Sequence, residues 1–322
     1  MDDIKRFFDS FGDEPRHLKG AAAFRLVVGL ALLYQLALLI GHFELTMGPS
    51  SIYAFDDFAA TFGSVHYSFM AISSSASWQW TGYIASLVII ALWTTGIGAQ
   101  VGKLGHVITA LTWWAVHSIH ARCPTLWDGG DNLIEIILLY AIVIDLWNSP
   151  GEGKRLGRVH ITLHNLAMLA CALQICIMYF TAGIAKVPGK YWQNGTAFYY
   201  VLASDEFGMT NMGPVIWDNR HMLALMTWGP LILQLAFPWI YFFGRPWPRR
   251  ITVLLAMSFH VGILVLMGLN TFAIIMVGAE LLLLSDEDYG ALGRLARQIW
   301  AKLRALARRI KRKPAAVTAE GG

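Results

Sequence analysis

Long apolar segments constrain this chain more than any other feature of its sequence. A helix needs about 20 apolar residues to cross a hydrocarbon layer of roughly 30 Å, and runs near ~17 residues are tolerated. A chain that is 56% hydrophobic and 14% charged also has more apolar surface than one soluble core can hide. We therefore predict an all-α integral membrane protein, a bundle of about eight transmembrane helices. The predicted spans are Ala22–Phe43, Thr81–Ala99, Leu104–His120, Leu133–Trp147, His164–Ala185, Met222–Phe243, Ile251–Gly268 and Thr271–Leu284.

The positions of Lys and Arg predict the orientation of this bundle. Cytoplasmic loops and tails near membrane spans carry an excess of these residues. Of the 25 Lys and Arg residues, 20 lie in the two tails and the loops on their side, and Arg25 lies within the first span. The other loops hold Arg122, Lys186, Lys190 and Arg220. We therefore predict a multi-pass protein of the cell (inner) membrane with both termini in the cytoplasm.

Three parts follow from this division. Residues 1–21 form a cytoplasmic N-terminal segment, residues 22–285 the transmembrane domain, and residues 286–322 a basic cytoplasmic tail. In the tail, apolar residues recur every three or four positions, with Arg and Lys on the other face. This pattern predicts an amphipathic helix on anionic headgroups. The lipid bilayer is thus the first expected partner, and nucleic acid is not one.

The segment HSIHARCPTLWDGGDNLIE, residues 117–135, gathers titratable groups on the outer side of the membrane. His117 and His120 lie one helical turn apart, and Asp131 and Glu135 share a face if a helix begins near Asp131. Two histidines with carboxylates could bind a metal. The preferred interpretation has no metal; instead Arg122 pairs with one of the aspartates beside the glycine turn. Glu135 stands out because a carboxylate within an apolar run is costly unless it has a partner or a function.

Lys186 ends an apolar run in MYFTAGIAKVPGKYWQNGTAFYY, residues 178–200. A helix that starts near His164 carries Lys186 roughly 33 Å along its axis, to the aromatic belt of the outer interface. The lysine either snorkels toward water or folds back into the bundle, where loss of water favours a neutral amine that can act as a base. Pro188 and Gly189 permit such a break in the helix.

His260 lies about ten residues from the inner end of the seventh predicted span, near the middle of the bilayer. A histidine at this depth is either a structural hydrogen-bonding group or a catalytic one. The sequence alone leaves both open.

Four stretches of sequence together resemble the HTTM family, the membrane domain shared with vitamin K-dependent gamma-carboxylase. They are FRLVVGLALLY, the GGDN turn, the lysine run YFTAGIAKVPGKYWQNGTAFYY and the late FHVGILVLMGLNTF. The run through NGTAFYY is also similar to the SdpB-like branch of that family. The resemblance covers approximately residues 20–285, and the lysine run is its most specific part.

The resemblance implies roles for particular residues. In the carboxylase, a lysine in an AG-x-x-K context is the amine base that deprotonates reduced vitamin K, and Lys186 falls on that position. His260 falls on the carboxylase's membrane histidine. Asp131 stands where the carboxylase has a further histidine, and the resemblance does not reach the carboxylase's lumenal domain. We therefore expect chemistry other than full vitamin K-dependent carboxylation.

The leading prediction is an enzyme that acts from the outer side on an exported peptide or a lipophilic substrate. Lys186 would be the base, and Asp131, Glu135 and His260 would tune or relay its proton. By resemblance, a reduced quinone is the implied cofactor, and the SdpB-like branch implies maturation of a secreted toxin peptide encoded nearby. The alternative is a non-catalytic peptide-binding, immunity or transport protein.

Overall fold

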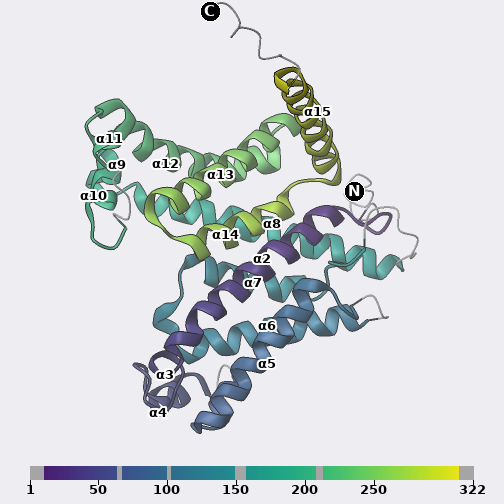
Figure 1. Cartoon of the computed structure of the whole chain (residues 1–322), viewed down its shortest axis with the longest axis vertical. Coiled ribbons are helices and arrows are strands. Elements are labelled where there is room, and N and C mark those ends of the chain that lie inside the picture. The colour runs from purple at the N-terminus through teal and green to yellow at the C-terminus, as the bar shows by residue number, and fades with distance from the viewer. Residues whose placement is uncertain (1–10, 64–66, 100–102, 149–156, 208–212, 312–322) are drawn as a thin grey trace, which may run out of the picture.

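The computed structural model describes residues 11–63, 67–99, 103–148, 157–207 and 213–311, and these residues are helical apart from turns and loops. Apart from the last helix, α15 (Asp286–Lys311), eight longer helices of the described chain form a bundle and run back and forth between its two ends (Figure 1). They are α2 (Leu18–Leu39), α5 (Ala76–Thr95), α6 (Leu104–Arg122), α7 (Gly129–Ala141), α8 (Arg158–Lys186), α12 (Arg220–Phe243), α13 (Pro246–Met267) and α14 (Asn270–Glu280).

Short elements close the bundle at one end, here called the outer end. They are η1 (Ile40–His42), α3 (Phe43–Thr46), α4 (Phe55–Phe58), the π-helical turn Ala59–Gly63, η3 (Phe69–Ile72), η4 (Pro124–Leu126), α9 (Lys190–Gln193), α10 (Ala197–Ala203) and α11 (Gly213–Trp217). At the other end, here called the terminal end, α2 begins, and η5 (Leu281–Leu283) leads into α15 (Asp286–Lys311) (Figure 1).

Each predicted span overlaps one of these eight helices, and the number of membrane crossings stays a prediction. The fourth differs most, because the prediction ran from Leu133 to Trp147 whereas α7 is shifted toward the N-terminus. Asp128 caps α7 by accepting hydrogen bonds from backbone N–H groups in its first turn, which starts the helix early. The Asp145 carboxylate accepts hydrogen bonds from the backbone N–H groups of Trp147 and Asn148. This local turn replaces the end of the predicted span.

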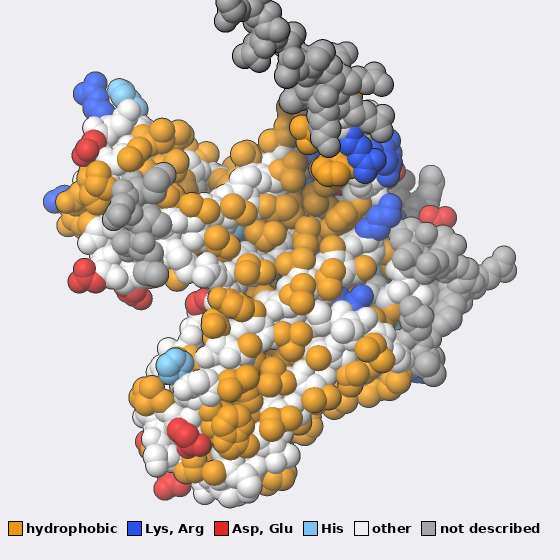
Figure 2. Space-filling view, in the orientation of Figure 1, with side chains coloured by type: hydrophobic (Ala, Val, Ile, Leu, Met, Phe, Trp, Pro, Cys, Tyr) orange, Lys and Arg blue, Asp and Glu red, His pale blue; other side chains and the backbone are white. Residues whose placement is uncertain are grey.

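Four helical stretches of the described chain are long and apolar enough to cross a membrane. They are Leu18–Thr46, Arg158–Lys186, Arg220–Phe243 and Pro246–Met267, and Asn270–Leu283 forms a shorter apolar helix. Their outward faces carry exposed large hydrophobic residues, such as Leu30 on α2 and Ile232 on α12. Hydrophobic side chains likewise cover most of the face shown in Figure 2. So much exposed apolar surface is what a lipid environment requires, and the chain is a membrane protein.

Helix α14 lies at the centre of the bundle, where it contacts α2, α7 and α13. Its approach to α2 depends on Gly278, since a Cβ atom there would lie 2.6 Å from Cγ2 of Val28. Small residues of this kind allow membrane helices to pack closely. The close packing brings Glu280, at the end of α14, into the interior of the bundle.

Helix α15 projects from the terminal end of the bundle (Figure 1). Its apolar residues Leu292, Leu295, Ile299 and Leu303 are exposed. Asp286, at its start, accepts hydrogen bonds from the backbone N–H groups of Leu18 and Lys19 and so caps α2. This long-range cap joins the start of α2 to the start of α15.

Candidate functional site

Lys186 is the last residue of α8, at the outer end of the bundle. Its side chain is half-buried and folds back along its own helix, where Nζ donates a hydrogen bond of 2.9 Å to the carbonyl oxygen of Ala182. Nζ also lies 5.4 Å from the centre of the Trp192 ring. In the described chain no carboxylate lies within ion-pair distance of this amine. The described surroundings therefore supply an aromatic face and a neutral carbonyl to the nitrogen.

His260 belongs to a buried cluster with Tyr179 and Glu280, which we call the central triad. His260 Nε2 lies 2.9 Å from the Tyr179 hydroxyl oxygen and 3.2 Å from Glu280 Oε1. The Tyr179 hydroxyl also donates a hydrogen bond to Glu280 Oε1. The ring of Phe237 stacks on Tyr179, with ring centres 4.3 Å apart. Helices α8, α13 and α14 each contribute one polar group to this contact.

The central triad has unused hydrogen-bonding capacity. His260 Nδ1 and Glu280 Oε2 are buried and have no hydrogen-bond partner. Buried polar atoms are nearly always paired, and unpaired ones are frequent at functional sites and at sites of bound water. The triad therefore has capacity for a further hydrogen bond with a water or a bound group.

Glu135 joins the two histidines of α6 at the outer end. Its Oε1 lies 2.5 Å from His117 Nδ1, and its Oε2 lies 3.3 Å from His120 Nδ1. The carboxylate in the apolar run thus has partners, as its cost in the membrane requires. Within the ranges that the structure describes, no group of three or more His, Cys, Asp and Glu side chains is arranged to hold a metal ion.

Asp131 lies beside Glu135 and the two histidines, and its hydrogen bonds hold helices together. One of its carboxylate oxygens accepts a hydrogen bond of 2.9 Å from Gln35 Nε2 on α2, and the other accepts one from the backbone N–H of Asp128. His120 Nε2 lies 3.9 Å from Asp131, which is beyond hydrogen-bond distance. Asp131 therefore completes the cap of α7 and ties α7 to α2.

Arg122 does not pair with Asp128 or Asp131 as the preferred interpretation of the sequence had it. Its side chain is fully buried under the segment between α3 and α4, the first outer loop. Its guanidinium donates hydrogen bonds to the carbonyl oxygens of Tyr53 and Gly48 and to the hydroxyl of Ser51. The aspartates are taken up by the cap of α7, so Arg122 instead holds the outer loop. Burial and the neighbouring Asp131 raise the pKa of Asp128, while hydrogen bonds from the first turn of α7 oppose this rise.

The four predicted site residues thus lie in three separate sets of contacts. Lys186 contacts Trp192, His260 belongs to the central triad, and Asp131 and Glu135 bond to α2 and α6. Sequence reasoning missed Tyr179 and Glu280. Glu280 carried the same signal as Glu135, a carboxylate that ends an apolar run, whereas Tyr179 had no signal beyond its place in the lysine run.

Similarity to known proteins covers some of these three sets of contacts and not others. The family model of the HTTM domain matches residues 140–289. Over these residues the chain is similar to the HTTM domain. The match contains α8, α12, α13 and α14, and hence Lys186 and the central triad. Asp131 and Glu135 lie outside it.

Two proteins of Bacillus subtilis (strain 168) are similar to the chain. The uncharacterized protein YitO is 26% identical over 282 residues, which cover 80% of this chain and 83% of YitO. The sporulation-delaying protein SdpB is 25% identical over 184 residues, which cover 53% of this chain and 55% of SdpB. These relatives support the SdpB-like branch of the HTTM family. No solved structure matches the chain.

A groove of about 430 Å³ lies between α12 and α13. We asked whether its lining residues could bind the quinone that the family resemblance implies. Its lining is apolar apart from Ser258, whose hydroxyl already donates to the carbonyl oxygen of Leu254. The ring oxygens of a quinone need hydrogen-bond donors that converge on them, as polar groups do in ligand pockets. The residues of this groove therefore do not fit a quinone head.

Proposed function

We propose that the chain is a multi-pass protein of the cell membrane that crosses it eight times, with both termini in the cytoplasm. The excess of Lys and Arg in the terminal-end loops and tails supports this orientation. The location of the start of α2 and of α15 at one end of the bundle supports an even number of crossings (Figure 1). In this orientation Lys186 and the group of Glu135, His117 and His120, here called the Glu135 cluster, face away from the cytoplasm.

Within this topology, we propose an enzyme that modifies an exported peptide or a lipophilic substrate, with Lys186 as base. The observation that carries this proposal is a half-buried amine at the outer end that faces an aromatic ring and a carbonyl instead of a carboxylate. A neutral amine in such a place accepts a proton from an acidic group of the substrate and becomes an ammonium ion, which later returns that proton to water. The resemblance of AGIAK to the carboxylase's lysine context supports the same role.

The central triad would serve Lys186 as a proton relay. Tyr179 and Lys186 are seven residues apart on α8, so they share a helix face and are separated by about 10 Å along the axis. A water or a substrate group between them would bond to the triad. Asp131 and Glu135 would act at a distance, by holding the outer end of α6 and α7 in place.

A second candidate is a non-catalytic protein that binds, transports or gives immunity to such a peptide. The separation of Lys186, His260 and the Glu135 cluster into three sets of contacts favours it, because catalytic groups normally converge on one reacting atom. The aromatic residues of α9 and α10 offer a surface for a peptide without any chemistry.

Mass spectrometry of exported peptides separates these functions. Peptides would be collected from cells with and without the gene for this chain. The enzyme predicts a peptide or lipid whose mass changes only when the protein is present. A change in exported amount at constant mass would favour transport, and unchanged mass and amount would favour binding; either result would contradict the enzyme.

A further inference from the structure

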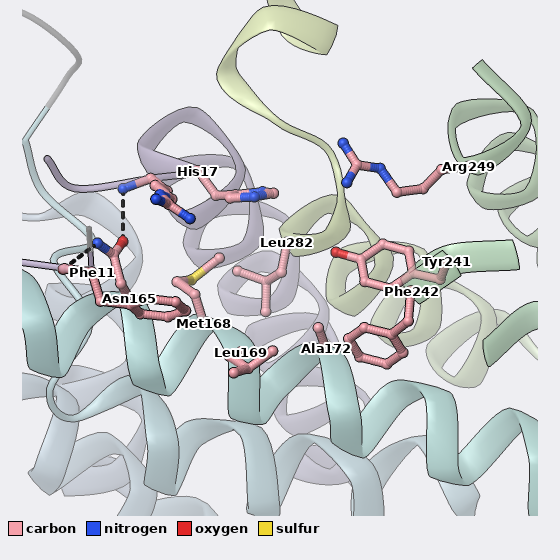
Figure 3. Close-up of a pocket in the computed structure, with 11 residues that line it drawn as sticks. Phe11, His17, Asn165, Met168, Leu169, Ala172, Tyr241, Phe242, Arg249 and Leu282 are labelled. Carbon is pink, nitrogen blue, oxygen red and sulfur yellow. Dashed lines mark hydrogen bonds between the residues drawn. The ribbon is translucent and has the colours of Figure 1, made fainter. Parts of the chain in front are cut away.

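A cavity of about 220 Å³ opens at the terminal end of the bundle, far along the chain from Lys186 and its neighbours. Figure 3 shows how α8, the start of α13 and the segment before α2 surround it. The side chain of Asn165 on α8 holds the segment before α2 in place by donating to the carbonyl oxygens of Phe11 and Glu14 and accepting from the backbone N–H of Arg16. The wall of the cavity is therefore a built feature of the fold.

Arg249 is the cation of this cavity that lacks an anionic partner, although its guanidinium lies 5.8 Å from the centre of the Tyr241 ring. In the described chain no carboxylate lies within ion-pair distance of its guanidinium, and its buried Nε has no hydrogen-bond partner. The adjacent Arg250 is different, because it forms an ion pair with Asp288. In Figure 3 the guanidinium of Arg249 points toward His17, with the Tyr241 hydroxyl beside the space between them. A half-buried cation with free donors is costly unless an anion joins it.

The charges around the cavity are positive where a ligand would bind. Arg16 and Arg249 line it, and burial lowers the pKa of His17, so the two guanidinium groups carry the positive charge at neutral pH. His17 Nδ1 donates to the carbonyl oxygen of Leu284. Among the described residues, Asp286 and Asp288 are the carboxylates that act on His17, and neither lines the cavity, since the first caps α2 and the second binds Arg250.

The size and the lower wall of the cavity restrict the ligand. Its volume is several times the roughly 30 Å³ that one water occupies and smaller than the ~300–1,000 Å³ of sites for drug-sized molecules. Met168, Leu169, Ala172, Phe242 and Leu282 provide an apolar wall below the arginines. This combination suits an anionic head group whose apolar remainder leaves the cavity along the bundle surface. The same end carries α15, whose amphipathic pattern suits a membrane surface.

We propose that this cavity binds the phosphate group of an anionic amphiphile, with Arg249 as its main contact. An anionic phospholipid and free phosphate share this chemistry, and the apolar wall favours the lipid. The inference uses neither Lys186 nor the central triad, so it stands or falls independently of the proposed enzyme.

Native mass spectrometry of the full-length protein in detergent tests this proposal. Phosphatidylglycerol, phosphatidylcholine and inorganic phosphate would be added separately to the wild type and to Arg249→Gln. Arg245→Gln is the matched control, because Arg245 is an exposed arginine just before α13 that does not line the cavity. Arg249→Lys keeps the charge and guards against a folding defect of the glutamine variant.

The wild type, Arg245→Gln and Arg249→Lys should retain phosphatidylglycerol in preference to phosphatidylcholine. Arg249→Gln should bind it about tenfold less, as expected for loss of one charge-assisted hydrogen bond. Binding of inorganic phosphate with the same dependence on Arg249 would support the site and assign it to a free anion. Equal binding by Arg249→Gln and the wild type, or equal loss in the Arg245→Gln control, would overturn the proposal.

Discussion

Three polar side chains from three helices meet in the central triad, where none of them is exposed to solvent. Tyr179, His260 and Glu280 are all buried, and the hydroxyl of Tyr179 bonds to both of the others. A buried carboxylate that loses a donor keeps the full cost of its desolvation. The triad should therefore behave as one unit when its members are replaced.

Replacement of Tyr179 by Phe should lower the stability of the protein by about 1–3 kcal/mol, because Glu280 loses a donor without gaining water. Glu280→Gln should cost a similar amount. The double variant should be less unstable than the sum of the two, with a coupling of about 0.5–3 kcal/mol. Thermal unfolding in detergent would measure this cycle, and strictly additive effects would show that the triad is not a coupled network.

Asp128 caps α7. Its pKa is raised, which means that the folded state disfavours the charged form of this carboxylate. Asp128→Ala should destabilise the protein by about 0.5–2 kcal/mol through loss of the cap. Asp128→Asn should be close to the wild type at pH 7, because the amide oxygen still accepts from the backbone and the charge beside Asp131 is gone. A charge needed at this position would instead make the two variants equally unstable in a melting experiment.

Close packing between helices appears at Gly278, where α14 meets α2. Gly278→Ala should destabilise the bundle by about 1–3 kcal/mol, because the added methyl group has no space beside Val28. Gly262 on α13 has open space around it and is the matched control. Gly262→Ala should be neutral or slightly stabilising, since Ala favours a helix over Gly by roughly 1 kcal/mol. Similar melting temperatures for the two variants would contradict this account of the packing.

Helix α15 presents its apolar residues to solvent on one face. A peptide of residues 286–311 should fold as a helix on vesicles that contain phosphatidylglycerol and remain largely unfolded with phosphatidylcholine alone. Added salt should weaken the binding, because screening reduces the attraction between Arg side chains and anionic headgroups. Circular dichroism would follow the change, and helix formation that ignores lipid charge would argue for a protein partner of this face.

The positions of the helices could be predicted from the sequence because each one carries its own apolar run. The same is true of α15, whose polar and apolar faces are encoded locally. The partners of the site residues could not be predicted in this way. Tyr179 and Glu280 are separated by 101 residues in the chain, and Arg122 reaches a loop about 70 residues earlier. Such contacts follow from the order in which helices pack, which a single sequence does not encode locally.

The whole molecule has a separate group of polar residues at each end of the bundle. The outer end carries the amine of Lys186 and the Glu135 cluster, and the terminal end carries the cationic cavity and α15. The HTTM match joins them, because residues 140–289 include both Lys186 and Arg249. This division predicts that variants of the cavity change lipid binding without changing the chemistry at Lys186.

The central claim is that the amine of Lys186 is a base at the outer end of the bundle, and a comparison of two lysine variants tests it most directly. Lys190, four residues later and exposed, is the matched control. Membrane fractions would be checked for equal amounts of both proteins, and the ratio of modified to unmodified exported peptide would be measured by mass spectrometry. We predict that Lys186→Met abolishes the modified product while Lys190→Met keeps it at the wild-type level. An unaltered product ratio in Lys186→Met would contradict the catalytic role.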